Sequence, residues 1–260
     1  MGWQHPLSSM GAEPLTAQQA PNPGFRNLLQ RNQAMCGRYY RRSDKQKIAE
    51  AFRTGLPTTF EILPSYNVAP QTFQPVVCLN RKTLERELLQ MRWGLVPYWA
   101  KDSKVAYSTI NAKAETLTTS PSFREAFKYR RCLIPMDGFY EWQPIDRKIK
   151  QPYAITLKDG AMFALAGLWD RWRDLKSGQE LLSYTVITTD PNELLEPFHN
   201  RMPVILRPGD YERWMAPADP SRLPVDLLRP YPDELMAAWK VGQSVGNVKN
   251  DEPGLIAPID

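Results

Sequence analysis

The chain has 260 residues, of which 23% are charged and 42% are hydrophobic, and this composition is ordinary for a globular protein. Its net charge of +5 at neutral pH suits a polyanionic partner, although a mildly basic solvated surface would give the same value. No window approaches the roughly 18 consecutive apolar residues of a membrane span, and the N-terminus lacks the layout of a signal peptide. We therefore expect no membrane association.

Three cysteines, Cys36, Cys78 and Cys132, form neither a CxxC pair nor a metal-ligand spacing, and their odd count argues against a disulfide framework. We expect a reducing compartment, which is the nucleoid-containing cytoplasm of a bacterium or the nucleus of a eukaryote. Cys78 and Cys132 lie in apolar runs, so they are predicted to be inert residues of buried strands. We expect no metal and no cofactor.

Residues 1–34 are rich in Gln, Pro, Asn and Ala and show no periodicity, which predicts a disordered extension. Either translation begins at Met35, or the extension is a leader that cleavage removes, and the sequence does not separate these alternatives. The rest of the chain, residues 35–260, is long enough to bury a sizeable core and is predicted to form one domain.

Beyond Met35, many short apolar runs and few helical patterns predict an α+β domain built on strands. Helices are expected, in chain order, over residues 43–54, 112–118, 122–129, 191–195 and 208–214. Strands are expected over residues 74–79, 87–92, 131–134, 138–143, 153–156, 163–169, 181–188 and 204–206. The elements do not alternate as βαβ units, which argues against a doubly wound parallel sheet.

Cys36 becomes chemically distinctive if removal of Met35 makes it the N-terminal residue, because its α-amine and thiol then sit on adjacent carbons. Such a 1,2-aminothiol condenses with an aldehyde to an imine, and the thiolate then closes a five-membered thiazolidine ring on the same carbon. An internal cysteine has no free amine and cannot do this. The alternative is that Cys36 is one more small buried residue.

Glu141 lies in the predicted strand over residues 138–143, where a period of two puts it on the face of Phe139 and puts Tyr140 and Trp142 on the other. A carboxylate walled by aromatic side chains loses hydration, which would raise its pKa toward neutrality and suit it to proton transfer. The alternative is a Glu that faces solvent on a half-buried strand.

His199 and Asn111 are the other polar candidates. His199 is the one histidine after Met35 and lies between two prolines, where a side chain that titrates near neutrality is useful, although a loop histidine can also be structural. Asn111 precedes the helix expected over residues 112–118, so it could serve only as the N-cap of that helix.

Seven short motifs occur in one order along the chain: Met35-Cys36-Gly37-Arg38, Tyr66-Asn67-Val68-Ala69-Pro70, Arg92-Trp93-Gly94-Leu95-Val96-Pro97, Asn111-Ala112-Lys113-Ala114-Glu115, Gly138-Phe139-Tyr140-Glu141-Trp142, His199-Asn200-Arg201-Met202-Pro203 and Val245-Gly246-Asn247-Val248-Lys249-Asn250. In this order they resemble the SRAP family, which includes the bacterial SOS response-associated protein and the eukaryotic abasic-site-processing protein. The likeness extends from Met35 to Pro258. It implies a single SRAP-like domain whose strand-rich core is mixed or antiparallel and barrel-like, with short flanking helices.

The resemblance also implies that Cys36 becomes the mature N-terminus and crosslinks covalently to abasic sites in single-stranded DNA during the DNA damage response. His199 is the family's candidate for opening the sugar, Glu141 would take a proton from the incoming amine, and Asn111 would hold the opened sugar. Arrest at the Schiff base would cleave the strand as a lyase does, so closure of the thiazolidine protects the DNA. We expect a monomer whose protein partners the sequence does not name.

Binding of DNA is expected to fall to Arg38, Lys113 and Arg201 at phosphates, with Trp93 and, as a second candidate, Trp99 stacking on bases. For both tryptophans the alternative is packing in the core. Lys113 stands where an arginine is common in the family, and lysine keeps the charge but lacks the bidentate fork.

Two functions of other classes stay open. One is a thiol peptidase or amidohydrolase, whose most natural substrate is the peptide bond before Cys36, so that the protein removes its own leader. The other is a non-catalytic module that binds single-stranded DNA, in which Cys36 is structural.

Overall fold

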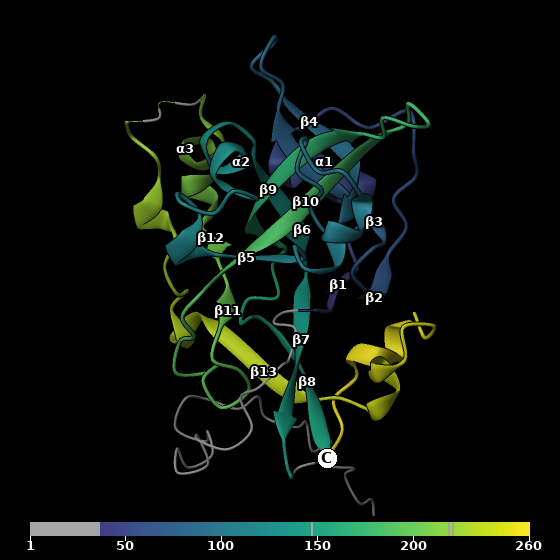
Figure 1. Ribbon diagram of the computed structural model, residues 1–260. Coiled ribbons are helices and arrows are strands. Elements are labelled where there is room, and N and C mark those ends of the chain that lie inside the picture. The colour runs from purple at the N-terminus through teal and green to yellow at the C-terminus, as the bar shows by residue number, and fades with distance from the viewer. Residues whose placement is uncertain (1–36, 147, 218, 220) are drawn as a thin grey trace, which may run out of the picture.

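The structure is a computed structural model that describes residues 37–146, 148–217, 219 and 221–260 (Figure 1). The predicted extension over residues 1–34 and the candidate nucleophile Cys36 therefore lie outside the described residues. No helix in the described part is long and apolar enough to cross a membrane.

Five strands close into a barrel. β10 runs parallel to β4, and the remaining neighbours around the ring, β4 with β3, β3 with β6, β6 with β9 and β9 with β10, are antiparallel. Their bounds, in chain order, are β3 Phe73–Leu79, β4 Arg86–Trp93, β6 Arg131–Met136, β9 Phe163–Arg173 and β10 Glu180–Thr189. Because the ring is closed, its strands leave no free edge on this path.

Three short strands extend this sheet: β5 (Asn111–Lys113) runs parallel to β10, while β11 (Met202–Pro203) and β12 (Ile205–Leu206) pair antiparallel with β10 and β9. A second, wholly antiparallel sheet lies below the barrel in Figure 1. Its strands, in spatial order, are β13 Met236–Lys240, β8 Lys150–Leu157, β7 Gly138–Pro144, β1 Tyr39–Arg41 and β2 Ser65–Val68.

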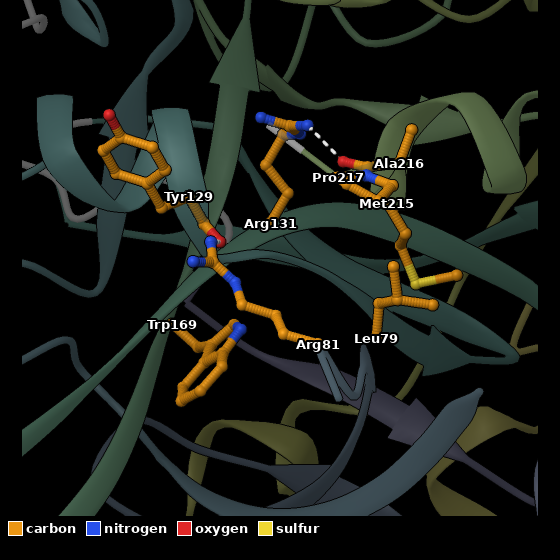
Figure 2. Close-up of a pocket in the computed structure, with 8 residues that line it drawn as sticks. All are labelled: Leu79, Arg81, Tyr129, Arg131, Trp169, Met215, Ala216 and Pro217. Atoms are coloured by element: carbon orange, nitrogen blue, oxygen red, sulfur yellow. Dashed lines mark hydrogen bonds between the residues drawn. The ribbon is translucent and has the colours of Figure 1, made fainter. Parts of the chain in front are cut away.

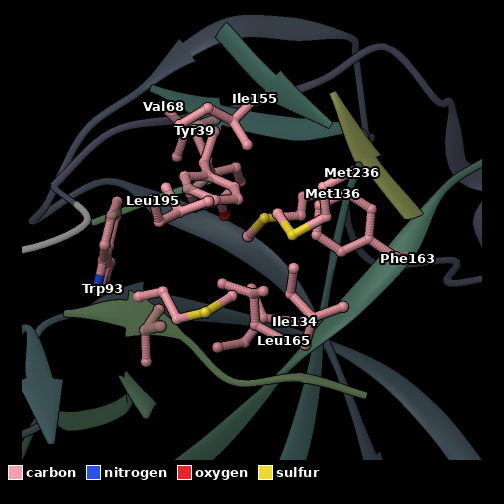
Figure 3. Packing of buried hydrophobic residues seen from close by; sticks show 14 of the residues in the cluster. Tyr39, Val68, Trp93, Ile134, Met136, Ile155, Phe163, Leu165, Leu195 and Met236 are labelled. Atoms are coloured by element: carbon pink, nitrogen blue, oxygen red, sulfur yellow. The ribbon is translucent and has the colours of Figure 1, made fainter. Parts of the chain in front are cut away.

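The core has two parts, because several barrel strands are buried on both faces. Side chains such as Trp93, Ile134 and Leu165 fill the barrel and meet Tyr39 and Ile155 of the second sheet in one cluster (Figure 3). The opposite faces of the barrel strands pack against three helices, α1 (Lys45–Phe52), α2 (Arg124–Tyr129) and α3 (Tyr211–Met215). Burial on both faces explains why these strands are nearly continuous apolar runs.

Short 3-10 helices connect and complete the sheets. Their bounds are η3 Ser103–Tyr107, η4 Ala114–Thr116, η5 Pro208–Asp210, η6 Val225–Leu227, η7 Asp233–Leu235, η8 Gln243–Gly246 and η9 Pro253–Ile256. η8 and η9 contribute Val245 and Leu255 to a cluster with Tyr40 and Tyr140, which packs the C-terminal segment onto the second sheet.

The predicted fold class, a strand-rich α+β domain with a barrel-like core and short helices, is confirmed. The eight predicted strands are present, with residues 204–206 forming β12 beside β11, and three of the predicted helices appear as α1, α2 and the η5–α3 pair. The buried thiols of Cys78 and Cys132 face each other across β3 and β6, and burial raises the pKa of Cys78 to about 12. Both are inert strand residues, as predicted.

Two predicted helices are wrong. Residues 112–118 instead form β5 and the turn of η4, because Asn111 to Lys113 pair with β10, and this tertiary pairing overrides the local helix propensity. Residues 191–195 form a turn in which the Asn192 side chain accepts a hydrogen bond from the Leu195 amide and donates to the Tyr231 carbonyl. Strands β1, β2, β5, β11 and β13 were not predicted, since each is short and depends on a partner outside its own segment.

Candidate functional site

The chain just after Cys36 runs beside Glu141. In the antiparallel pair of β1 and β7, Tyr39 lies opposite Phe139, and the Tyr140 amide donates to the Arg38 carbonyl at 3.0 Å. Continuing this register by two residues from Tyr39 places Gly37 opposite Glu141. Two motifs that are about a hundred residues apart in the sequence therefore meet on neighbouring strands.

Glu141 is only 6% exposed, so the solvent-facing alternative is wrong. The predicted alternation of β7 is confirmed, because Phe139 belongs to the central core cluster whereas Tyr140 and Trp142 pack in the cluster on the other face of the second sheet. The carboxylate of Glu141 is thus held in a largely dehydrated region, on the side of the strand that faces the barrel.

His199 is brought toward this strand by its neighbour Phe198. The ring of Phe198 packs edge-on against Tyr153 at 4.7 Å between centroids, and Tyr153 lies opposite Glu141 in the pairing of β7 with β8. The His199 amide donates to the Leu195 carbonyl at 3.1 Å, which fixes the backbone of the loop. The structure therefore brings the predicted acid–base pair into one region.

The imidazole of His199 has a defined protonation state. Burial lowers its pKa, and the positive charges of Arg201 and Lys150 lower it further. The Arg201 amide donates to Nδ1 at 3.1 Å, so Nδ1 must be an acceptor. His199 is consequently neutral at pH 7 with its proton on Nε2, which makes Nε2–H a hydrogen-bond donor.

Arg201 is buried and bonded to internal partners. Its two terminal nitrogens donate to the two carboxylate oxygens of Glu115 at 2.7 and 2.8 Å, and also to Asp190 at 3.0 Å and the Thr188 carbonyl at 2.6 Å. Although burial acts to raise it, these hydrogen bonds from Arg201 hold the pKa of Glu115 below its usual value. A phosphate would have to displace these partners to reach the guanidinium that was predicted to bind DNA.

Asn111 and Lys113 lie on β5, next to the Glu115 end of this network. Asn111 pairs with Val186 of β10 and is half-buried, and the predicted helix that it would cap is absent, because η4 begins after Lys113. The Lys113 side chain is exposed and has no ion-pair partner among the described residues. It remains a candidate for a phosphate contact.

Arg38 is held by a residue that the sequence did not single out, Asn67. The Nη1 group of Arg38 donates to Asn67 Oδ1 at 2.7 Å and to the Val245 carbonyl at 3.0 Å, and its guanidinium lies 5.9 Å from the centre of the Trp142 ring. The Asn67 amide also donates to three carbonyls of the C-terminal motif, those of Val245, Asn247 and Asn250. Asn67, itself part of the second motif, thus links the first motif to the last, and its place inside a motif is the signal that could have revealed it.

The prediction that Trp93 stacks on bases is wrong. Trp93 is fully buried between Tyr39 and Tyr184, with ring centroids at 5.3 and 6.2 Å, so the core-packing alternative holds. Its Nε1 donates to the Ile110 carbonyl at 2.9 Å, which anchors the segment that leads into Asn111. Trp99, by contrast, is 50% exposed, and neighbouring Tyr98 is 58% exposed.

Cavities do not mark this site. A cavity of about 20 Å³ is lined by Arg81, Tyr129 and Arg131, and Figure 2 shows Arg131 hydrogen-bonded to the Ala216 carbonyl beside it. Another, of about 330 Å³, lies next to β12. Neither is lined by a predicted catalytic residue, and in the described part of the chain no three His, Cys, Asp or Glu side chains gather as metal ligands.

Comparisons with known proteins agree with the motifs. Residues 35–248 match the family described as SOS response associated peptidase (SRAP). The abasic site processing protein YoqW of Bacillus subtilis is 44% identical over 226 residues, which cover 85% of this chain and 99% of that protein. The abasic site processing protein HMCES of Gallus gallus is 36% identical over 76% of this chain and 67% of its own length. A crystal structure of a protein from Bacteroides thetaiotaomicron superposes with a TM-score of 0.77 at 27% identity, covering 86% of this chain and all of that one.

Proposed function

Because the chain belongs to the SRAP family, we propose that it recognises abasic sites in single-stranded DNA and crosslinks to them through Cys36, once residues 1–35 have been removed. The observation that carries the proposal is the position of the chain just after Cys36, which lies beside the buried Glu141 in a region that also holds His199. Its similarity to proteins named for abasic site processing supports the choice of substrate.

The first step is opening of the abasic sugar, which exists mostly as a cyclic hemiacetal. As the bond between C1′ and O4′ breaks, negative charge develops on O4′, and the Nε2–H of neutral His199 donates a hydrogen bond to it. Asn111, an amide side chain on the fixed strand β5, holds the opened sugar. The C1′ hydroxyl gives up its proton to water as its oxygen becomes the aldehyde oxygen, and O4′ takes up a proton to become a hydroxyl, so the product of this step is a free aldehyde at C1′.

The α-amine of Cys36 then attacks C1′. Glu141 accepts the proton that makes this amine an ammonium group and returns it to the hydroxyl of the carbinolamine, which leaves as water. The resulting iminium is attacked by the Cys36 sulfur, which loses its proton as the carbon–sulfur bond forms. Overall, aldehyde and aminothiol give a thiazolidine and one water, with no oxidant or reductant.

Ring closure decides the fate of the DNA. An iminium at C1′ is an electron sink that promotes β-elimination of the 3′-phosphate, which is the reaction of an abasic-site lyase. In the thiazolidine C1′ is saturated, so the sink is gone and the strand stays whole. Weak lyase activity would be the side reaction of a protein that is too slow to close the ring.

Three exposed groups are the candidates for holding the rest of the strand. Lys113 is an exposed cation near Asn111 on β5, and Tyr98 and Trp99 offer exposed rings that can stack on bases. None of these groups reads base edges in a fixed geometry, so we expect little sequence preference. We further propose that the protein acts as a monomer, in the cytoplasm with the nucleoid or in the nucleus according to its source.

Denaturing gel electrophoresis tests the proposal. Protein that begins at Cys36 is incubated with single-stranded DNA carrying one abasic site, beside the full-length chain and beside Cys36→Ala in the same short form. We expect a heat-stable shifted band only from the Cys36-start protein, and strand cleavage without a stable adduct from Cys36→Ala. No band from the Cys36-start protein, or an equally stable one from Cys36→Ala without reductant, would contradict the mechanism.

A second candidate function is cleavage of the peptide bond before Cys36, which the family's description as a peptidase favours. The position of Glu141 opposite Gly37 in the continued register supports a role for it in such a cleavage. Intact mass of the purified full-length protein, followed over time, tests it: loss of residues 1–35 in the wild type but not in Glu141→Gln would support self-processing. An unchanged mass in both proteins would count against it.

A further inference from the structure

The segment from Gly94 to Ala100, called the strap below, carries Tyr98 and Trp99 and is held against β9 and β10. It leaves β4 at Gly94, where φ is +116° and a Cβ atom would lie 2.6 Å from the Ala106 carbonyl oxygen, so only glycine fits. Every second residue from Gly94 to Ala100 is hydrogen-bonded to β9 or β10. The four ties join the Gly94 amide to the Tyr184 carbonyl, the Val96 amide to Ser183 Oγ, the Tyr98 amide to Asp170 Oδ2 and the Ala100 carbonyl to Trp172 Nε1.

Asp170 is the one charged group among these ties, and it is buried. Its Oδ2 accepts from the Tyr98 amide at 3.1 Å and from Arg130 Nη2 at 3.2 Å, while Oδ1 lies 3.1 Å from Arg130 Nε. The guanidinium of Arg130 in turn lies 5.8 Å from the centre of the Tyr98 ring. Asp170 and Arg130 therefore hold both the backbone and the ring of Tyr98.

Burial of the Asp170 carboxylate costs desolvation free energy. Desolvation raises the pKa of Asp170 even though Arg130 and two backbone amides oppose the shift. The strap that it fixes presents two large aromatic side chains to solvent, and such rings on a rigid support lose little entropy when they bind. Lys101, two residues after Trp99 in the sequence, is exposed and has no ion-pair partner among the described residues.

We propose that Asp170 is a positioning residue for DNA binding: with Arg130 it holds the Tyr98–Trp99 strap in the conformation that stacks on bases of the single strand flanking the abasic site. This inference rests on the proposed function. Asp170 itself does not touch DNA and lies outside all seven motifs. Asp170 is expected to affect the DNA concentration that half-saturates crosslinking, and not the chemical step at Glu141 and His199.

The test measures the rate of crosslinking against DNA concentration for the wild type, Asp170→Asn, Trp99→Ala and the double variant, all beginning at Cys36. Loss of one stacked base weakens binding by about fivefold or more, so each single variant should raise the half-saturating DNA concentration by that factor. The rate at saturating DNA should stay within about twofold of the wild type, because no catalytic group is altered. The double variant should be no weaker than Asp170→Asn alone, because the loss of Asp170 already displaces Trp99.

Hydrogen exchange of the Tyr98 amide gives a second readout, which should quicken in Asp170→Asn. Where Asp170→Asn does not fold, Arg130→Lys replaces it, since lysine keeps the charge and loses the fork. An unchanged half-saturating concentration, a loss confined to the saturating rate, or fully additive variants would overturn the inference. If the wild type binds single-stranded DNA without crosslinking, the proposed function fails, and the same comparison by fluorescence anisotropy on intact DNA still decides the role of Asp170.

Discussion

Two buried arginines, Arg131 and Arg201, hold two regions of the molecule together by different means. Arg131 is 7% exposed and Arg201 is 9% exposed, and the guanidinium of each makes at least four hydrogen bonds. Arg131 lies on the outer face of the barrel and contacts the ends of α2 and α3, and Figure 2 shows it near Tyr129 and Ala216. Arg201 lies in the region of the motifs, two residues after His199.

The partners of Arg131 are all backbone carbonyls. Two of them, from Phe127 and Lys128, belong to the last turn of α2, and the other two, from Trp214 and Ala216, belong to the end of α3. One cation thus satisfies the free carbonyls at the C-terminal ends of two short helices, where the helix dipole favours positive charge. Two of these bonds are buried and two are part-buried, and none involves a second charge.

The partners of Arg201 are mainly carboxylates, and these are open to solvent. The side chains of Glu115 and Asp190 are 51% and 77% exposed. Screening weakens such pairs, so we expect them to contribute more to the position of the His199 loop than to global stability. Two arginines that are buried to a similar extent therefore have different roles: Arg131 stabilises the fold, and Arg201 holds the geometry of the site.

The largest expected effect is on the outer face. Replacing Arg131 with Met leaves four carbonyls at the ends of two helices without this donor and should lower the free energy of unfolding by about 3 kcal/mol, measured by urea denaturation. The folded fraction should crosslink abasic DNA at the rate of the wild type. Arg81→Met is the matched control, because Arg81 lines the same cavity from an exposed position, and it should cost less than about 1 kcal/mol. Equal destabilisation by the two variants would contradict this role of Arg131.

The converse is expected for Glu141→Gln in the region of the motifs. The amide keeps the shape of the carboxylate but cannot accept a proton, so the crosslinking rate at saturating DNA should fall about a hundredfold. The urea midpoint should change little, since the substitution is isosteric. Glu85→Gln, at an exposed turn, is the control and should change neither quantity. A wild-type rate in Glu141→Gln would remove Glu141 from the mechanism.

The same contrast explains how far the sequence could lead. Strands β3, β6 and β9 were predicted because their residues are buried on both faces, so that each strand is a continuous apolar run in the sequence. β5 was predicted as a helix because the residues from Ala112 to Glu115 favour one locally. Its pairing with β10 crosses more than seventy residues of sequence, and no local pattern contains it.

The site shows the same limit. Glu141, His199 and Asn111 could be named from their motifs. The contacts that hold the surrounding segments in place could not be predicted, because they join residues distant in sequence, such as Arg201 with Glu115 and Arg38 with Asn67. Trp93 and Trp99 lie six residues apart in one segment and look alike in the sequence, yet one is core and the other surface. The difference in their burial follows from the path of the chain after Gly94, which the sequence does not show.

Glu115→Gln tests the Arg201 network with a smaller expected effect. If Arg201 positions His199, loosening it should lower the saturating crosslinking rate by about tenfold and leave the half-saturating DNA concentration unchanged. If Arg201 instead serves as a phosphate ligand, the same variant frees its guanidinium and should lower the half-saturating concentration. Asp190→Asn is the control, because Asp190 makes a single, more exposed contact and should have a weaker effect.

The smallest effect concerns the pH dependence of His199. Its pKa is lowered first by burial and then by Arg201 and Lys150, so the folded protein binds this proton less tightly than the unfolded chain, and the proton favours unfolding as pH falls below 6.5. The crosslinking rate should therefore hold through neutral pH and decline only on the acid side, where imidazolium forms and its Nδ1 can no longer accept the Arg201 amide. Lys150→Gln removes one of the two positive charges, which should raise the pKa and move the acid limb of the pH–rate profile upward. Lys148→Gln, exposed on the same connection, should leave that limb in place. An identical shift in both variants would point to general surface charge, and the specific field of Lys150 at His199 would then be excluded.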